Sequence, residues 1–453
     1  MSPFAESIRQ HNTHSTLTPM AGPRETPSAS LGLDAIVVPA SRPAAHLDHA
    51  VTLARAAGCW LLVLCSGRLD STDAVKFLAA RSYHKAVAID LPRGYSHKLL
   101  CFPELAAIKN ELPKACGFYT TDLSMKRNIG LVLARMLKWR RIFFLDDDIR
   151  DIAHPHLQRT VDMLGSFSAA GLWVTKFPDN SVVCHANRET GGSQGVFVSG
   201  AALAVNCEAQ IGFFPDIYNE DWLFMFDYAS AGKLANSSLE ATQLRYDPFA
   251  KARRAAWQEF GDVIAEGLYT LLHLGLDVAH ATREYWGYFL EARRNFLEAI
   301  LTRLPDTDPE MRSKIQMSVL QAEKCLQMIK PDLCERYVRA WRNDLADWKQ
   351  RVPGIAAMPS TEAALLELEL TFATPGTNAG RILPHRDEAT PSVKAGPVSI
   401  PRIDTLPEMS EHTRTLQPVS SASTQPCLVP GPGRPETLLA AAINGCDSSV
   451  FLG

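Results

Sequence analysis

The stretch that decides the fold is Arg141–Ile149, which reads RIFFLDDDI. The apolar run RIFFL is typical of a buried strand, and Asp146, Asp147 and Asp148 follow it directly. In a parallel sheet, ligands bind beyond the carboxyl ends of the strands, so the three aspartates are expected at a ligand-binding edge. Adjacent carboxylates repel one another unless a cation or hydrogen-bond donors compensate them. Mg2+ and Mn2+ suit such carboxylates together with diphosphate oxygens. The alternative is a solvated acidic turn that opens a helix, because acids favour helix N-termini.

Short apolar runs alternate with helical stretches on both sides of this segment, from about residue 33 to about residue 245. The other strand candidates are Leu33–Pro39, Trp60–Cys65, Ala86–Ile89, Leu172–Thr175 and Gly195–Val198. Helix-like pieces between them include His46–Ala57 and Lys126–Leu137. Strands that alternate with helices indicate βαβ units. The predicted fold class is therefore α/β, with a mostly parallel sheet flanked by helices.

The pattern becomes helical after residue 250. Apolar residues recur every three or four positions from Trp257 to Gly275, and helical patterns continue to Trp348 and then over Thr361–Phe372. Residues 251–372 are thus predicted to form a helical annex to an α/β domain at 31–250. Its apolar faces leave two roles open, completion of an acceptor site and pairing of two copies as a homodimer. Residues 1–30 and the Pro-rich residues 373–453 lack such periodicity and are predicted to be disordered tails.

Three further segments join the acidic triplet in a recognisable order. Residues 33–43, LDAIVVPASRP, form an apolar strand that ends in a proline and a polar turn. Residues 126–130, KRNIG, open a helix that leads into the strand before the triplet, and residues 191–221 run from a Gly-rich entry to Glu220-Asp221. In order and spacing these segments resemble the first strand, the RN-x-G helix, the D-x-D motif and the ED motif of family-2-type GT-A glycosyltransferases, which belong to the nucleotide-diphospho-sugar transferase superfamily.

The resemblance implies a GT-A fold and transfer of a sugar from a nucleotide-diphosphate sugar to an acceptor hydroxyl, as in a hexosyltransferase, with Mn2+ or Mg2+ as cofactor. It implies that Asp148 holds the metal and that Asp146 contacts the ribose. Asp221 would be the general base of an inverting reaction, and Glu220 would orient the acceptor. The expected nucleotide-binding residues are Pro39, Ser41, Arg42, Ser66, Arg127, Asn128, Asp146 and Asp147, and the expected metal ligands are Asp148, Asp146 and Asp247.

The chain departs from the family pattern at two places. The second strand of the family usually ends in an acidic turn that binds the nucleotide base, whereas this chain has no acid there before Asp70. Base recognition is left to the backbone, to Ser66 or to Asp90. Many relatives also supply a histidine metal ligand after the ED motif. Here Asp247 is the expected replacement, because a carboxylate oxygen suits Mg2+ or Mn2+.

Two other functions stay open. A sugar nucleotidyltransferase also places carboxylates around a metal, but it usually opens with a Gly-rich phosphate loop, and residues 39–43, PASRP, lack glycine. A catalytically silent GT-A-like binding protein would use helices 251–350 as its interaction surface. The sequence contains neither a G-x-x-x-x-G-K-[ST] phosphate loop nor a G-x-S-x-G element.

Composition limits the expected binding partners and the expected cellular location of the protein. A formal net charge of −3 does not indicate a nucleic-acid binder, and no apolar stretch reaches the roughly 20 residues of a membrane span. The first residues lack the basic and apolar regions of a signal peptide. None of the ten cysteines is spaced as C-x-x-C, so reduced cysteines and a cytoplasmic location are expected.

Overall fold

The computed structural model describes residues 30–112, 122–175, 181–193, 198–209, 211–304 and 308–376. All of them belong to one compact unit, Met1–Arg386. The predicted disordered tails therefore lie outside the described residues, apart from Ser30 and residues 373–376. The predicted strand at Gly195–Val198 also falls mostly outside them.

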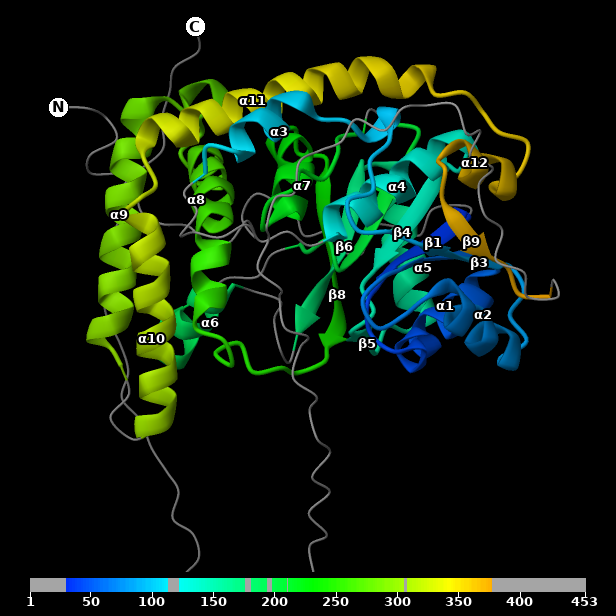
Figure 1. The fold of residues 1–453 in the computed structure, drawn as a ribbon, viewed down its shortest axis with the longest axis horizontal. Coiled ribbons are helices and arrows are strands. Elements are labelled where there is room, and N and C mark those ends of the chain that lie inside the picture. The colour runs from blue at the N-terminus through cyan, green and yellow to red at the C-terminus, as the bar shows by residue number, and fades with distance from the viewer. Residues whose placement is uncertain are drawn as a thin grey trace, which may run out of the picture. The chain divides into compact units, whose positions relative to one another are not determined.

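The described residues form a nine-stranded sheet with the order β5-β8-β6-β7-β4-β1-β2-β3-β9. Six strands run in one direction, and β5, β7 and β9 run in the opposite one. The strands are β1 Ala35–Ala40, β2 Trp60–Cys65, β3 Ala86–Asp90, β4 Arg141–Leu145, β5 Ile149–Arg150, β6 Ala169–Thr175, β7 Ala202–Asn206, β8 Leu234–Gln243 and β9 Thr371–Ala373. This mostly parallel sheet, flanked by helices (Figure 1), confirms the predicted α/β fold class.

Both faces of the sheet are covered, which explains why the central strands are apolar throughout rather than alternating. On one face, Ile36 and Val38 of β1 join a core with α1 (Asp48–Ala57), α2 (Ser71–Ala80) and α5 (His154–Asp162). On the other face, Val37 packs against α4 (Leu123–Met136). A Cβ added at Gly130 of α4 would lie 2.9 Å from Cγ1 of Val37, so only a glycine allows α4 to approach β1 this closely.

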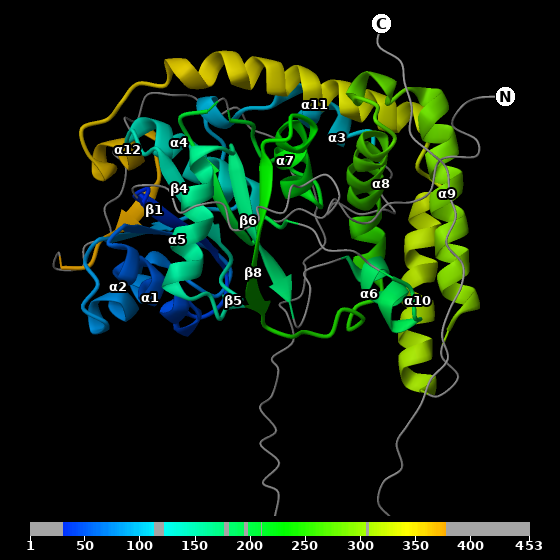
Figure 2. The same ribbon diagram turned by 180° about the vertical axis from the view of Figure 1, so that it is seen from behind.

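Helices occupy most of the region after residue 250, and they pack beside the sheet (Figures 1 and 2). They are α8 Arg253–His273, α9 Arg283–Thr302, α10 Pro309–Leu326, α11 Pro331–Arg351 and α12 Thr361–Glu367, while α3 Pro103–Lys109, α6 Val182–Glu189 and α7 Glu220–Ser230 precede them. Long α11 runs past α3, α7 and α8 in both views. A domain boundary at residue 250 and a homodimer formed through these helices stay predictions.

The last predicted helix ends earlier than expected. It was predicted over Thr361–Phe372, but α12 ends at Glu367, and Glu369 has a left-handed φ of 54° that stops a helix from continuing. Thr371–Ala373 then forms β9, which pairs antiparallel with β3. Ala373, the predicted start of the C-terminal tail, is thus part of the sheet.

The cysteines depart from expectation at one position. Cys59, Cys65, Cys101, Cys184, Cys207 and Cys334 are free thiols. Cys325 on α10 is disulfide-bonded, which corrects the expectation that the cysteines are reduced. Among the described helices, none has both the length and the apolar composition needed to cross a membrane. The cytoplasmic location stays a prediction.

Candidate functional site

The acidic triplet lies in a tight turn at the carboxyl end of β4. The backbone N–H of Asp146 donates to the carbonyl of Ala201 (2.9 Å), and the N–H of Ile149 donates to the carbonyl of Asp146 (3.1 Å). Asp147 and Asp148 are buried. The short strand β5, rather than a helix, begins at Ile149. These features disagree with the solvated, helix-opening turn that was the alternative interpretation of the triplet.

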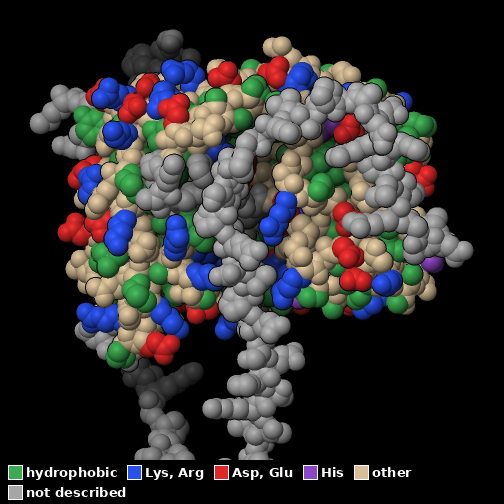
Figure 3. Space-filling view, in the orientation of Figure 1, with side chains coloured by type: hydrophobic (Ala, Val, Ile, Leu, Met, Phe, Trp, Pro, Cys, Tyr) green, Lys and Arg blue, Asp and Glu red, His purple; other side chains and the backbone are tan. Residues whose placement is uncertain are grey.

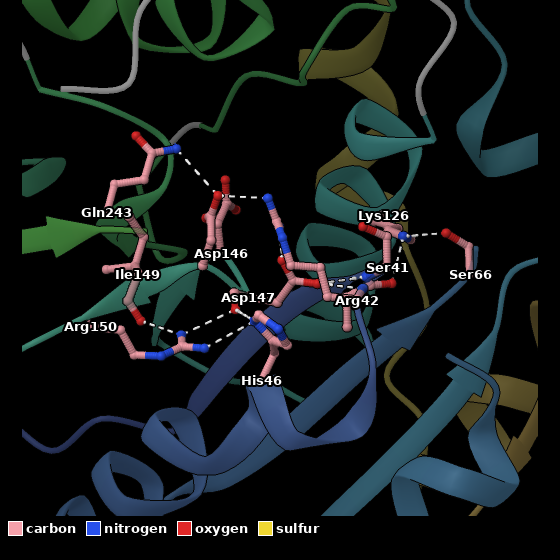
Figure 4. Close-up of polar contacts among 12 residues, drawn as sticks. Ser41, Arg42, His46, Ser66, Lys126, Asp146, Asp147, Ile149, Arg150 and Gln243 are labelled. Carbon is pink, nitrogen blue, oxygen red and sulfur yellow. Dashed lines mark hydrogen bonds and ion pairs between the residues drawn. The ribbon is translucent and has the colours of Figure 1, made fainter. Parts of the chain in front are cut away.

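Arg42, in the loop after β1, compensates two of the three carboxylates (Figure 4). Its guanidinium forms ion pairs with Asp147 and with Asp148, the latter at 2.8 Å. The backbone N–H groups of Ser41 and Arg42 also donate to Oδ2 of Asp147, at 2.7 and 2.9 Å. Burial lowers the pKa of Arg42, but the nearby aspartates outweigh that effect and raise it. Asp147 therefore holds the β1 loop, while Arg42 places a positive charge beside Asp148.

Arg127 of α4 compensates the third carboxylate and connects it to the ED motif. Its Nη2 lies 3.0 Å from both carboxylate oxygens of Asp146, and its Nη1 donates to Glu220. Arg127 itself is buried. Burial raises the pKa of Asp146 to about 6 and that of Glu220 to about 8, against the lowering effect of Arg127. One guanidinium thus joins the predicted donor side and the predicted acceptor side of the site.

Glu220 and Asp221 begin α7, as predicted for the ED motif. Oδ2 of Asp221 accepts a 2.7 Å hydrogen bond from the backbone N–H of Gly200. A Cβ at Gly200 would lie 2.8 Å from Cβ of Asp221 and 2.9 Å from Nη1 of Arg127. Gly200 therefore allows three chain segments to meet at this point. Asp221 is half-buried, whereas Glu220 is buried.

The other predicted nucleotide-binding residues are placed differently. Pro39 is buried inside β1. Ser66 accepts a 2.7 Å hydrogen bond from Nζ of Lys126, a buried lysine that also donates to the carbonyl of Ala40 (2.9 Å) and that was not among the predicted site residues. Lys126 consequently ties the carboxyl ends of β1 and β2 together. The only available signal was its place beside the RN motif.

Asn128 is turned toward the interior. Its amide nitrogen donates to the carbonyl of Phe214 and its amide oxygen accepts from the N–H of Phe214, both at 2.8 Å. Asn128 is buried, so these two bonds fix the segment that leads to α7. The two bonds give Asn128 a structural role, and its contact with nucleotide stays a prediction.

Asp70, which follows β2, and Asp90, the last residue of β3, both accept hydrogen bonds from the start of α2. Oδ1 of Asp70 accepts from the N–H of Asp73, and Asp90 accepts from both the N–H and the hydroxyl of Ser71 (2.7 Å each). The start of α2 thus engages Asp70 and Asp90. The sequence proposed the side chains of Ser66 and Asp90 for base recognition. Of these two, only Asp90 is engaged by the start of α2.

Asp247 does not join the triplet. Its carboxylate accepts from the N–H of Phe249 (2.8 Å) and lies 3.7 Å from Nζ of Lys314 on α10. Within the described residues, no three His, Cys, Asp or Glu side chains are grouped to hold a metal ion. Lys314 engages Asp247 and Arg127 engages Asp146, so the expected set of three carboxylate ligands stays a prediction.

Gln243 takes the place beside Asp148 that the sequence assigned to Asp247. Its Nε2 lies 3.3 Å from Oδ2 of Asp148, and its Oε1 is buried without a hydrogen-bond partner in the described part of the chain. Gln243 is the last residue of β8 and is in register with Ile149, immediately after the triplet. Its signal in the sequence was a polar residue at the end of a strand, which gains meaning only once the strand pairing is known.

The residues around Asp148 fit a hard divalent cation. Mg2+ is commonly held by one or two protein carboxylates and by substrate phosphate oxygens. The unpaired Oε1 of Gln243 is a neutral oxygen donor of the kind such ions accept. A half-turn of its terminal amide would direct this oxygen toward Asp148. Asp148 and Gln243 could hold such an ion only if Arg42, which lies 2.8 Å from the same Oδ2 of Asp148, moved aside, so their role as metal ligands is a proposal.

Acidic and basic side chains are interspersed over the face shown in Figure 3. The segment after β8 contributes Arg245, Lys251 and Arg253, which are exposed.

No protein-family model matches the chain, and no curated protein matches it. Among solved structures, the chain is similar to a mannosyltransferase from Pyrobaculum calidifontis in complex with GDP-Man and Mn2+. The sequence identity is 13%, the TM-score is 0.35, and the likeness covers 72% of this chain and 91% of that chain. A likeness at this level carries no functional argument, so the function must be inferred from the geometry of the site.

Proposed function

We propose that the protein is a metal-dependent glycosyltransferase that moves a sugar from a nucleotide-diphosphate donor to an acceptor hydroxyl. The observation that carries the proposal is the position of Arg127 between Asp146 and Glu220. It brings an acidic turn suited to a metal diphosphate next to a carboxylate pair suited to proton transfer. Transfer of a glycosyl group needs both functions in one site.

On the donor side, Asp148 and Gln243 would hold Mn2+ or Mg2+, which supplies charge neutralisation for the leaving diphosphate. Arg42 lies beside Asp148 and presents a planar fork of donors that suits phosphate oxygens. The Lys126–Ser66 pair lies where β1 and β2 end, so Ser66 would meet the nucleoside. Because Ser66 accepts its bond from Lys126, its own hydroxyl hydrogen would be available to a ligand acceptor.

On the acceptor side, Asp221 is the proposed general base. It is more exposed than Glu220, and its backbone contact with Gly200 fixes the orientation of its carboxylate. Asp221 would take the proton of the acceptor hydroxyl as that oxygen attacks the anomeric carbon, which gives an inverting reaction. Buried Glu220 would position Arg127 and the acceptor.

The test is release of nucleotide from a panel of UDP-sugars and GDP-sugars with Mn2+ and candidate acceptors, using the wild type and Asp221→Asn. The substitution keeps the size of the side chain and removes its basicity, so kcat is expected to fall about 10²–10⁴-fold with nucleotide affinity unchanged. Turnover by Asp221→Asn at the wild-type rate would refute the role of Asp221. A folded wild type that turns over no donor would favour the catalytically silent binding protein.

A further inference from the structure

Asn219, the residue before the Glu220–Asp221 pair, has an unusual backbone conformation. Its φ and ψ of 62° and 35° lie in the left-handed region, which costs energy for residues other than glycine, although least for asparagine and aspartate. Asn219 occupies the N-cap position of α7, yet its side chain makes no capping bond. Its amide nitrogen instead donates to Oδ1 of Asp262 on α8 at 2.9 Å. The bond therefore links α8 to the start of α7.

The backbone of α8 lies directly against this segment. A Cβ at Gly261 would be 2.3 Å from the carbonyl oxygen of Tyr218 and 2.7 Å from its Cβ. Only a glycine permits so close an approach. Gly261 thus brings Asp262 within reach of Asn219.

Asp262 is itself held by a buried cluster of charges. Arg293 of α9 donates to Asp262 at 3.0 Å, to both oxygens of Glu259 at 2.8 and 2.9 Å, and to Glu266 at 2.7 Å. These four side chains are buried. Three carboxyl groups face one guanidinium away from water, and buried ion-pair clusters of this kind are weak contributors to stability. Stability alone is therefore a poor reason for this cluster.

We propose that Asp262, fixed by Arg293, is a positioning residue that holds Asn219 in the left-handed conformation and thereby aims Glu220 and Asp221. The inference rests on the proposed function of that pair. It gives the helices after residue 250 a role in the site. Relaxation of Asn219 would rotate the first turn of α7 and shift Asp221 from Gly200, and displacements of about 1 Å in a catalytic group cost up to roughly 10²-fold in rate.

The decisive variants are Asn219→Ala and Asn219→Gly. Alanine disfavours a left-handed φ and cannot donate to Asp262, so kcat is expected to fall about tenfold to a hundredfold with nucleotide affinity unchanged. Glycine also lacks the bond but adopts this φ at no steric cost, so kcat should stay within about threefold of the wild type. Equal losses in the two variants would overturn the proposal.

A second pair separates positioning from general stability. Asp262→Ala is expected to lower kcat as Asn219→Ala does, whereas Glu259→Gln, which contacts the same Arg293 but not Asn219, should leave kcat unchanged. Combining Asp262→Ala with Asn219→Gly should restore kcat, because glycine no longer depends on the bond. A loss that persists in the double variant, or that Glu259→Gln shares, would overturn the proposal.

Hydrogen exchange gives a readout that needs no activity. The N–H groups of Trp222 and Leu223 donate to the carbonyl of Asn219. Asp262→Ala should speed their exchange, and Glu259→Gln should not. Unchanged exchange in Asp262→Ala contradicts the positioning role. An inactive wild type with faster exchange in Asp262→Ala contradicts only the proposed function.

Discussion

The amide nitrogen of Gln243 lies 3.3 Å from Oδ2 of Asp148, although the two residues are 95 positions apart. The antiparallel pairing of β5 with β8 brings them together. If both residues hold the metal, substitution of Gln243 must change the metal dependence of nucleotide binding.

Gln243→Leu is expected to raise the Mn2+ concentration that gives half-maximal nucleotide binding by about tenfold or more, because one oxygen donor is lost. Gln243→Glu keeps an oxygen donor and adds charge, so it should lower that concentration. Binding titrations over a range of Mn2+ measure both effects. An identical Mn2+ requirement in the wild type and both variants would exclude Gln243 from the metal site.

Arg127→Met tests the guanidinium that joins the two halves of the site. The variant leaves buried Glu220 and half-buried Asp146 without their cation, and loss of one partner of a buried pair typically costs about 3–5 kcal/mol. Urea denaturation should therefore show a lower free energy of unfolding. Arg127→Lys keeps the charge but not the fork, so its loss should be smaller. Wild-type stability in Arg127→Met would contradict the described ion pairs.

Gly200→Ala tests the close approach of Asp221 and Arg127. The added Cβ would lie 2.8 Å from Cβ of Asp221, and such overpacking usually costs about 1–3 kcal/mol. Lower stability and slower donor turnover are expected together. Gly212→Ala is the matched control, because the nearest atom to its Cβ would be 3.6 Å away. Equal behaviour of the two variants would show that the approach at Gly200 is not a constraint.

The buried charges around Arg293 should make the stability of the protein depend on pH. Burial raises the pKa of Glu266 from the ordinary 4.5 to about 8, and the lowering effect of Arg293 does not offset it. Between these two values the folded protein keeps a proton that the unfolded chain has released. The free energy of unfolding should therefore fall as the pH rises through this window, and should level off above it.

Glu266→Gln replaces the titrating carboxyl group with an amide that does not titrate. The stability of this variant relative to the wild type should therefore increase as the pH rises from about 5 to about 8. Urea denaturation at several pH values measures the difference. The exposed Glu310→Gln serves as control and should parallel the wild type. A constant difference between Glu266→Gln and the wild type would contradict a protonated Glu266.

Local sequence predicted the elements that are buried on both sides. RIFFL, WLLVLC and the strand that contains Val37 are continuous apolar runs, and a strand covered on both faces needs no other signal. The three residues of β9 could not be predicted, since they extend a helical pattern and become a strand only by pairing with β3. The reversed direction of β7 likewise depends on its partners β4 and β6.

The site residues divide in the same way, into those that local sequence predicts and those that depend on the pairing of strands. The triplet and the Glu220–Asp221 pair were predicted because each is contiguous in the sequence and follows or opens a regular element. Asp247 was predicted as the replacement for the histidine ligand of the family, whereas Gln243, which the register of β8 puts beside Asp148, was not predicted. The buried charges around Arg293 had a readable signal, since Glu259, Asp262 and Glu266 fall on one face of α8.

Calorimetric titration of UDP and GDP, with and without Mn2+, into the wild type and Asp148→Ala tests the central claim most directly. Asp73→Ala, which removes an exposed aspartate from α2, is the control. The proposed donor site predicts Mn2+-dependent binding of one nucleotide by the wild type and by Asp73→Ala, and loss of that binding in Asp148→Ala. A folded wild type that binds neither nucleotide with Mn2+, or an Asp148→Ala variant that binds as the wild type does, would contradict it.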